Sequence, residues 1–408
     1  MSTNVTHRGL VPLLLMASSL TVMAGAVIGP VVAEIGKALS LSPTQSGRLI
    51  TTHGLTIAVV SLAAGRLIDR VGPRVPLSIG LLVYGAAGVA GMFIRDYEWL
   101  LVARAILGLG VAGMFTGVTV AILRAYSGAE QSRVMGLRGA ANSIGGVIWP
   151  LIGGGLGAIA WYAPFGIYAV GLPLGIAAFF IIPKLPAVVQ EADGASVHDA
   201  GTGTGAEADA GSEARREQGD SKTRITAWLI LPYVAMFATN MLLYSIVVFF
   251  PQRLARMGIE STVLISLFLA AAAMCATLVA TQYGKVARHL SIPGRALVAL
   301  VLWVPAFALA AAPGGWILML VGAMLFGTGQ GLMLPTVMLW VDSLADKRRQ
   351  ATASSLLPVF GFLGQFASPP AFGPIVEARG FGVMFIVAVA LPLVLLLPTV
   401  AAARKSPR

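Results

Sequence analysis

Long apolar stretches alternate with short polar segments along almost the whole chain. Each stretch has about the twenty residues that a helix needs to cross ~30 Å of hydrocarbon. The pattern therefore predicts an all-α membrane protein with twelve transmembrane helices joined by short connections. The predicted spans are 9–33, 45–65, 75–94, 99–123, 134–157, 161–183, 226–250, 262–283, 294–312, 315–341, 351–370 and 379–402.

The composition of the chain supports a membrane protein. Of its 408 residues, 57% are hydrophobic and 11% are charged, whereas soluble domains carry about 25% charged residues. The net charge of +11 does not indicate nucleic-acid binding, because the basic residues lie in short segments between apolar spans. Most of them fall on the side that carries both chain ends, so the positive-inside rule predicts cytoplasmic termini.

One long segment interrupts the apolar pattern near the middle of the chain. Residues 186–223 are rich in Gly, Ala, Ser and acidic residues and show no apolar periodicity. Such a segment cannot bury enough apolar surface to fold by itself. We predict a disordered cytoplasmic linker between two six-helix halves, residues 1–185 and 224–408.

The connection between the second and third spans carries the most specific pattern. Its sequence, GRLIDRVGPRVP, covers Gly65–Pro76, and its charges must lie outside the hydrocarbon. Any polytopic protein could use a charged hairpin of this kind. The order of particular residues is more specific, and these residues are Gly65, Asp69, Arg70, Gly72 and Arg74.

This order resembles the loop between helices 2 and 3 of the major facilitator superfamily, a family of secondary transporters. The resemblance implies two pseudo-symmetric six-helix bundles that rock around a central substrate site. It also implies that the loop clamps the cytoplasmic ends of the two halves in the outward-facing state. We expect Asp69 to lie at the start of the third span, favoured by that helix's N-terminal dipole and within reach of Arg70 and Arg74.

The fourth span contains an arginine, Arg104, in the sequence LLVARAILGLG. An arginine inside a bilayer is costly, so Arg104 either faces the bundle interior or snorkels to the outer headgroups. The order Leu100, Arg104, Gly108 and Gly110 resembles the fourth-helix motif of the family. There the arginine is linked to proton handling, through pairing with or perturbing a nearby carboxylate.

The fifth span contains Gly145, Pro150, Gly153 and Gly154 in the sequence SIGGVIWPLIGGG. Proline removes a helix hydrogen bond, and clustered glycines let helices approach closely. The spacing resembles the antiporter signature of proton-coupled exporters in the family, although Trp149 stands where that signature has glycine. A glycine-rich packing face without a transport role is the alternative.

Few ionisable residues fall within the predicted spans. No Asp or Glu lies at the centre of a span, and Glu34 lies near the outer end of the first. A cationic substrate would lack a deep counter-charge, so neutral or anionic substrates are favoured. His53 has a titration range suited to proton coupling. We take His53, Arg104 and Glu34 as candidates for that role, with a hydrogen-bonded structural histidine as the alternative.

Four uncharged amide side chains also lie within the predicted spans. They are predicted to line the substrate cavity, or else to form hydrogen bonds between helices. These residues are Asn142, Asn240, Gln330 and Gln365.

The sequence contains no recognisable phosphate-binding loop, metal-ligand cluster or catalytic triad. We therefore expect no enzyme activity, no metal and no cofactor, with a proton gradient as the energy source. A membrane sensor would need a folded soluble domain, and the linker offers none.

Taken together, these features predict a proton-coupled secondary transporter that works by alternating access. The resemblance favours an efflux antiporter for drugs, siderophores or similar amphipathic compounds, in the cytoplasmic (inner) membrane of a bacterium. An importer or exchanger of small organic anions is the alternative, favoured by the missing acids and the surplus of arginine. The expected partners are a small-molecule substrate, protons and the lipid bilayer, with no nucleic acid, and the protein is expected to act as a monomer.

Overall fold

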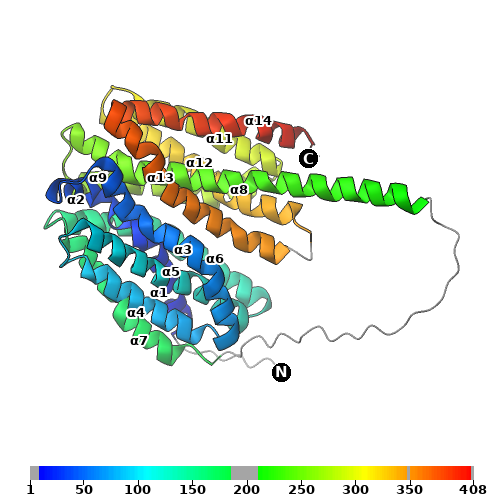
Figure 1. The fold of residues 1–408 in the computed structure, drawn as a ribbon, viewed down its shortest axis with the longest axis horizontal. Helices are drawn as coiled ribbons and strands as arrows, with labels where there is room; N and C mark the ends of the chain where they lie inside the picture. Colours follow the sequence, from blue (N-terminus) through cyan, green and yellow to red (C-terminus); the bar gives the residue numbers. More distant parts are fainter. Residues whose placement is uncertain (1–8, 185–209, 347–349, 406–408) are drawn as a thin grey trace.

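The computed structural model describes residues 9–184, 210–346 and 350–405, which are almost entirely helical (Figure 1). The first described range contains α1 (Leu10–Ala26), η1 (Gly29–Val31), α2 (Val32–Ala38), α3 (Pro43–Val71), α4 (Arg74–Ala90), α5 (Tyr97–Ala125), α6 (Gly128–Gly157), η2 (Ala163–Val170) and α7 (Gly171–Ile181). The later ranges contain α8 (Ala210–Arg256), α9 (Thr262–Thr281), α10 (Tyr283–Ala287), α11 (Ile292–Ala311), α12 (Trp316–Leu344), α13 (Gln350–Ala388) and α14 (Ala390–Lys405).

These helices make the twelve passes that the sequence predicts. Eight segments of the described chain are long and apolar enough to cross a membrane. The last of them, Thr352–Lys405, contains two passes, because Gly380 has a φ of 84° and interrupts the helix. The helices α3, α4 and α6, which are shorter or more polar, supply the remaining three passes.

Local sequence determines where several helices begin. Ser42 caps α3 through a reciprocal capping box with Gln45, and Pro43 occupies the first helical position. Asp96 accepts a hydrogen bond from the Trp99 backbone nitrogen and caps α5. These caps satisfy backbone groups at helix ends that the short connections would otherwise leave unpaired.

Glycines at corresponding positions pack the two halves in the same way. Gly108 of α5 lies against the backbone of α3, and Gly327 of α12 lies against the backbone of α9. Gly110 packs against α4, and Gly329 packs against α11. An added Cβ at any of the four would collide with a neighbouring helix, so these close helix contacts depend on glycine.

The helices have two ends that differ in their contacts. The terminal end carries the end of α7, the start of α8 and the end of α14, and the far end carries α2 and the connection between α8 and α9 (Figure 1). Helices of the first half contact the second half mainly through the pairs α3–α13 and α6–α9. Four polar contacts between the halves lie toward the far end of the described helices: Thr44–Glu377, Gly154–Thr262, His53–Gln365 and Lys37–Glu260.

The charged segment after the second span is more helical than the sequence predicts. We expected a loop over Gly65–Pro76, but α3 continues to Val71, and Gly72 ends it with a φ of 79°. Arginine, leucine and isoleucine extend a helix readily, so the charges do not stop it. The expectation that Asp69 begins the third span is therefore wrong, because Asp69 lies in the last turn of α3.

The predicted linker also differs from the structure at one end. Residues 186–209 lie outside the described residues, whereas α8 already begins at Ala210. Residues 210–223 are therefore helical, and they extend α8 beyond the bundle (Figure 1). An existing membrane helix adds residues at little cost once its first turn has formed, which explains the extension.

Candidate functional site

A cavity of about 420 Å³ lies between the two halves. Helices α1 and α6 line it from the first half, and α8, α9 and α12 line it from the second. The residues that line it are uncharged and mostly apolar, including Val22, Leu269 and Phe326. A volume of several hundred Å³ with a largely apolar lining suits a small organic molecule.

Three of the four predicted amides line this cavity: Asn142, Asn240 and Gln330. The Asn240 Nδ2 atom donates to the Met236 backbone oxygen at 3.1 Å. The Gln330 Oε1 atom is buried and has no hydrogen-bond partner among the described residues. The second half therefore contributes two amide side chains to the cavity wall, and amides can both donate and accept hydrogen bonds.

Gln365 does not line the cavity, so its predicted place there is wrong. It is 2% exposed, and its Nε2 atom lies 3.0 Å from the Nε2 atom of His53. The side chain fits because α13 packs on α3 at Gly54, where an added Cβ would lie 2.9 Å from the Gln365 Cδ atom. His53 thus forms a buried hydrogen bond between the two halves.

Arg104 is buried within the first half and does not snorkel. It is 3% exposed, its Nη1 atom donates to the Tyr168 hydroxyl at 3.1 Å, and its guanidinium lies over the Phe165 and Tyr168 rings. Each ring centroid is 5.2 Å from the guanidinium carbon, within the range of a cation–π contact. None of the ion pairs found in the described part of the chain involves Arg104. Among the described residues Arg104 therefore contacts aromatic rings and forms no ion pair with a carboxylate.

Arg138 is a second buried arginine, and the sequence analysis missed it. The predicted fifth span, 134–157, includes it, but we assigned it no role; it is 8% exposed inside the first half. Its Nε atom donates to Ser18 Oγ at 3.1 Å, and its Nη1 atom donates to Thr119 Oγ1 at 2.7 Å. The signal that could have revealed it is its spacing of four residues from Asn142 on α6.

The glycines of the predicted antiporter signature lie where α6 meets other helices. Gly153 packs against the backbone of Val27, and Gly154 packs against α9 of the other half. Pro150 lines the cavity. Gly145 and Trp149 face α1, where the Trp149 Nε1 atom donates to Ser19 Oγ at 2.9 Å. The bulky Trp149 therefore takes part in helix packing through a specific hydrogen bond.

The predicted gating residues lie at the terminal end. Asp69 accepts a hydrogen bond from Arg124 Nη2 at 3.0 Å, and both residues belong to the first half. Arg74 donates to the Phe179 backbone oxygen at 2.6 Å instead of pairing with Asp69. Gly65 and Arg70 lie on α3, and Gly72 ends that helix.

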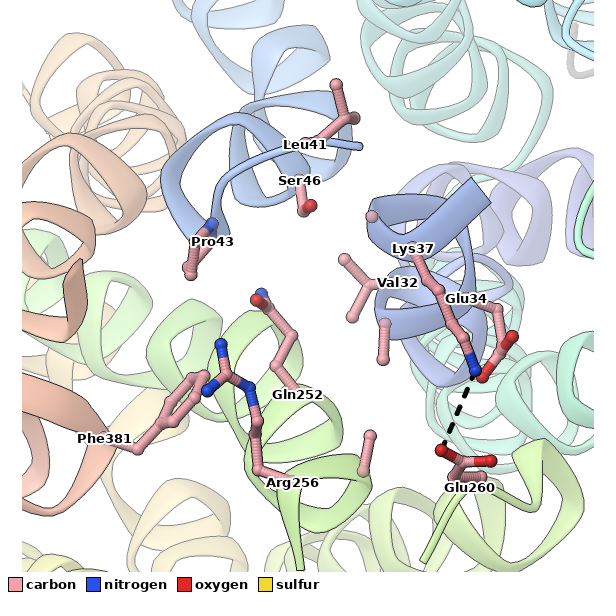
Figure 2. Close-up of a pocket in the computed structure, with 13 residues that line it drawn as sticks. Val32, Glu34, Lys37, Leu41, Pro43, Ser46, Gln252, Arg256, Glu260 and Phe381 are labelled. Carbon is pink, nitrogen blue, oxygen red and sulfur yellow. Dashed lines mark ion pairs between the residues drawn. The ribbon is translucent and has the colours of Figure 1, made fainter. Parts of the chain in front are cut away.

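Glu34 lies apart from His53 and Arg104, in a second pocket at the far end. This pocket of about 300 Å³ is lined by α2 and α3 on one side and by α8 on the other. Figure 2 shows Glu34 beside Lys37, with Gln252 and Arg256 projecting from α8. The Lys37 Nζ atom lies 3.9 Å from Glu260 Oε1, and both side chains are exposed. The described residues contain no cluster of ligands for a metal ion.

Two bundles with a shared central cavity define a class of membrane transporter, and solved transporters have the same fold. A bacterial homologue of the human lysosomal transporter Spinster, in an inward-facing and unoccupied conformation, matches with a TM-score of 0.75. The match covers 98% of this chain and 99% of that chain at 17% identity. A D-xylose–proton symporter matches with a TM-score of 0.76 at 13% identity, covering 97% of each chain.

The family is also evident from the sequence. The model of the Major Facilitator Superfamily matches residues 14–369, so the chain belongs to that family of multi-pass membrane transporters. This confirms both the expected family and the expected fold.

Two curated relatives come from Bacillus subtilis (strain 168). Multidrug resistance protein 1 is 32% identical over 136 residues, which are 33% of this chain and 35% of the relative. Multidrug efflux protein YfmO is 30% identical over 172 residues, which are 42% of this chain and 43% of the relative. The matched stretches therefore span less than half the length of either relative.

Proposed function

We propose that this protein is a proton-coupled efflux antiporter for neutral or acidic amphipathic molecules. The terminal end is cytoplasmic in this proposal, and the membrane is the cytoplasmic membrane of a bacterium. The uncharged, largely apolar lining of the central cavity carries the proposal. Such a lining binds an apolar body by the hydrophobic effect, and it offers no carboxylate to a cation.

The direction of transport rests on two supports. The glycines and the proline of α6 resemble the antiporter signature of exporters, and the partial relatives from Bacillus subtilis are named as multidrug proteins. Gly154 packs against Thr262 at the far end, and the residues that line the cavity lie on the terminal side of this contact. With the terminal end cytoplasmic, a substrate would enter the cavity from the cytoplasm.

His53 is the residue that we propose couples this movement to protons. It hydrogen-bonds Gln365 across the two halves, and Arg104 lies one turn before Gly108, the residue of α5 that packs against the His53 backbone. Protonation would turn the His53 Nε2 atom into a donor and would add a second positive charge near Arg104. Both changes disfavour the packing of α3 against α13. Protonation would therefore favour the state that is open at the far end.

The proposal is tested in inverted membrane vesicles that contain a pH-reporting dye and an imposed inside-acid gradient. Addition of a neutral amphipathic dye or antibiotic is expected to cause proton efflux from vesicles that contain the protein. His53→Gln is expected to retain binding of the compound and to lose proton efflux. Binding and transport without any proton movement in the unaltered protein would overturn the proposed coupling.

A matched pair of variants tests the cavity itself. A Cβ added at Gly146 meets no atom within 4 Å, and Gly146 lines the cavity, so Gly146→Phe would fill the cavity without a backbone clash. Gly155 has the same open surroundings but lies exposed on the same helix, so Gly155→Phe is the control. Gly146→Phe is expected to abolish transport and Gly155→Phe to preserve it. Equal activity in both would remove the cavity as the substrate site.

Import or exchange of small organic anions is the second candidate. Arg104 and Arg138 favour it, because each is buried and neither forms one of the ion pairs found in the described residues. In the vesicle assay this function would give a response to small carboxylates alone, or exchange that needs no proton gradient.

A further inference from the structure

Four residues of α6 form a stripe that leads from the terminal end into the cavity. Arg138, Asn142, Gly146 and Pro150 are spaced by four, so they lie on one face of the helix. The last three line the cavity. Arg138 is one turn closer to the terminal end and about 15 Å beyond the first residue of α6. It therefore lies beyond the terminal-side end of the cavity lining and is buried inside the bundle.

A chain of hydrogen bonds joins this arginine to the cavity wall. The Arg138 Nε atom donates to Ser18 Oγ at 3.1 Å, and Ser18 Oγ donates to Asn142 Oδ1 at 2.8 Å. The chain uses the acceptor oxygen of Asn142 and leaves its amide hydrogens for the cavity. The guanidinium polarises the Ser18 hydroxyl, which strengthens the donor character of the Asn142 amide.

The charge of Arg138 is not compensated by an anion within the described residues. Its other polar contacts are the neutral Thr119 Oγ1 atom at 2.7 Å and the Phe115 backbone oxygen at 3.5 Å. The three ion pairs found in the described chain involve other residues. A buried cation without an anionic partner costs free energy, which binding of an anion would recover.

The two walls of the cavity therefore differ in hydrogen-bonding character. The wall formed by α6 offers the Asn142 amide hydrogens with the Arg138 charge behind them. The wall formed by α8 and α12 carries the neutral amides of Asn240 and Gln330, with no charged residue among its lining. Apolar side chains lie between these walls.

We propose that Arg138 and Asn142 form a subsite for the carboxylate of an amphipathic acid. The apolar body of the acid lies in the cavity, and its other end lies toward the wall that carries Asn240 and Gln330. The subsite rests on the proposed function, because it names the substrate class that the central cavity accepts. Phe115, whose ring lies 5.3 Å from the Arg138 guanidinium carbon, also contacts Phe362 of the other half. A ligand at the subsite therefore lies where the halves meet.

The test compares two probes of nearly equal shape, naphthylacetate and its neutral amide naphthylacetamide. Binding to the purified full chain is measured by titration of its thermal stability at fixed pH. The carboxylate is expected to bind at least about tenfold more tightly than the amide, because a charge-assisted hydrogen bond is stronger than a neutral one. Equal affinity for the two probes, or stabilisation by neither, would overturn the subsite.

Substitutions in α6 test which residue causes the preference for the carboxylate over the amide. Arg138→Gln is expected to reduce the preference for the carboxylate to less than about twofold, and Arg138→Lys to keep part of it. Arg133→Gln is the matched control, because Arg133 lies on the same helix but is exposed and pairs with Glu130. The control is expected to keep the full preference, and its loss there would contradict the assignment.

A second variant keeps the test valid if Arg138→Gln fails to fold. Asn142→Asp places a carboxylate beside the Ser18–Arg138 chain, so the protein itself would neutralise the subsite. It is expected to lose the preference for naphthylacetate, while detectable stabilisation by naphthylacetamide shows that the variant is folded and that its cavity still binds the apolar body. An Asn142→Asp protein that still prefers the acid would exclude the subsite.

The vesicle assay separates this proposal from the proposed function. Proton efflux caused by neutral amphipathic compounds, without any preference for the acid, would reject the subsite and leave the antiporter intact. A clear preference for the acid in binding, with no proton efflux for any compound, would reject the antiporter and leave the subsite intact.

Discussion

The two ends of the molecule differ in how the halves meet. At the far end, Thr44 of α3 donates to Glu377 of α13 at 2.6 Å, so a polar contact crosses between the halves. At the terminal end, the pair of Asp69 and Arg124 joins α3 to α5 within one half. Gly65 and Gly284, also at the terminal end, have no atom within 4 Å of an added Cβ.

This difference indicates which interactions a change of state must break. Opening the far end requires breaking the close packing between helix backbones and the Thr44–Glu377 hydrogen bond. Among the described residues at the terminal end, the Asp69–Arg124 pair lies within one half, so separating the halves there leaves that pair intact. The structure therefore represents the state that is closed at the far end, and the predictions below test that assignment from the largest effect to the smallest.

The largest effect is expected from a disulfide across the far end. A Cβ on Gly373 would lie 2.8 Å from the Thr44 Cβ atom, so cysteines at both positions need only a small shift to reach disulfide geometry. In a Cys275→Ser background, Thr44→Cys with Gly373→Cys is expected to cross-link under oxidation and to stop transport completely. Reductant is expected to restore transport, as measured in the vesicle assay.

A terminal-end pair provides the control for this cross-link. Continuing the α3–α13 register from the contact of Gly54 with Gln365 brings Gly65 opposite Ser354. Gly65→Cys with Ser354→Cys is expected to cross-link only when the far-end pair is apart. If both disulfides formed in the same molecules, the far end and the terminal end would be closed at the same time, which would contradict alternating access.

A bulky residue in the far-end contact is expected to have the next largest effect. A Cβ on Gly154 would lie 2.5 Å from the Ser266 Cβ atom and 2.6 Å from the Thr262 backbone oxygen, both in the other half. Overpacking costs about 1–3 kcal/mol, so Gly154→Val is expected to slow transport about tenfold or more. Gly155→Val, exposed on the same helix, is the control for expression and folding. Equal rates for the two variants would show that Gly154 does not limit far-end closure.

Much of this fold is predictable from apolar length alone. A segment of about twenty apolar residues has few alternatives to a membrane helix, because lipid offers no partner for an open backbone. The end of α3 was less predictable, because charged residues indicate the membrane boundary and not the end of the helix. The residue that does end it is Gly72, through its positive φ.

The site was only partly predictable, because its contacts join residues far apart in the chain. The pairing of His53 with Gln365 spans 312 residues, and nothing local in either sequence indicates it. Arg138 resembled an orientation determinant because it lies near the end of an apolar span. Only the packing of α6 against α1 and α5 shows that its side chain is buried.

A moderate effect is expected from Asp69→Asn at the terminal end. The Asp69 side chain is 60% exposed, and an exposed ion pair contributes at most about 1 kcal/mol. The variant is therefore expected to express normally and to lower the transport rate by up to about fivefold. Asp69→Glu, which keeps the charge, is expected to retain most of the activity. Full activity in Asp69→Asn would remove the gate assignment.

The smallest effect is expected at the far-end pocket of Figure 2. Lys37 and Glu260 also join the two halves, but their side chains are 71% and 65% exposed and 3.9 Å apart. Water and salt screen such a pair, so Lys37→Gln is expected to change the transport rate by less than about twofold. The measurement is the vesicle assay at low and high salt, with Lys285→Gln, at the other end of the molecule, as the control. A large loss confined to Lys37→Gln at low salt would mean that charge at the far end stabilises closure, and that close backbone packing alone is not enough.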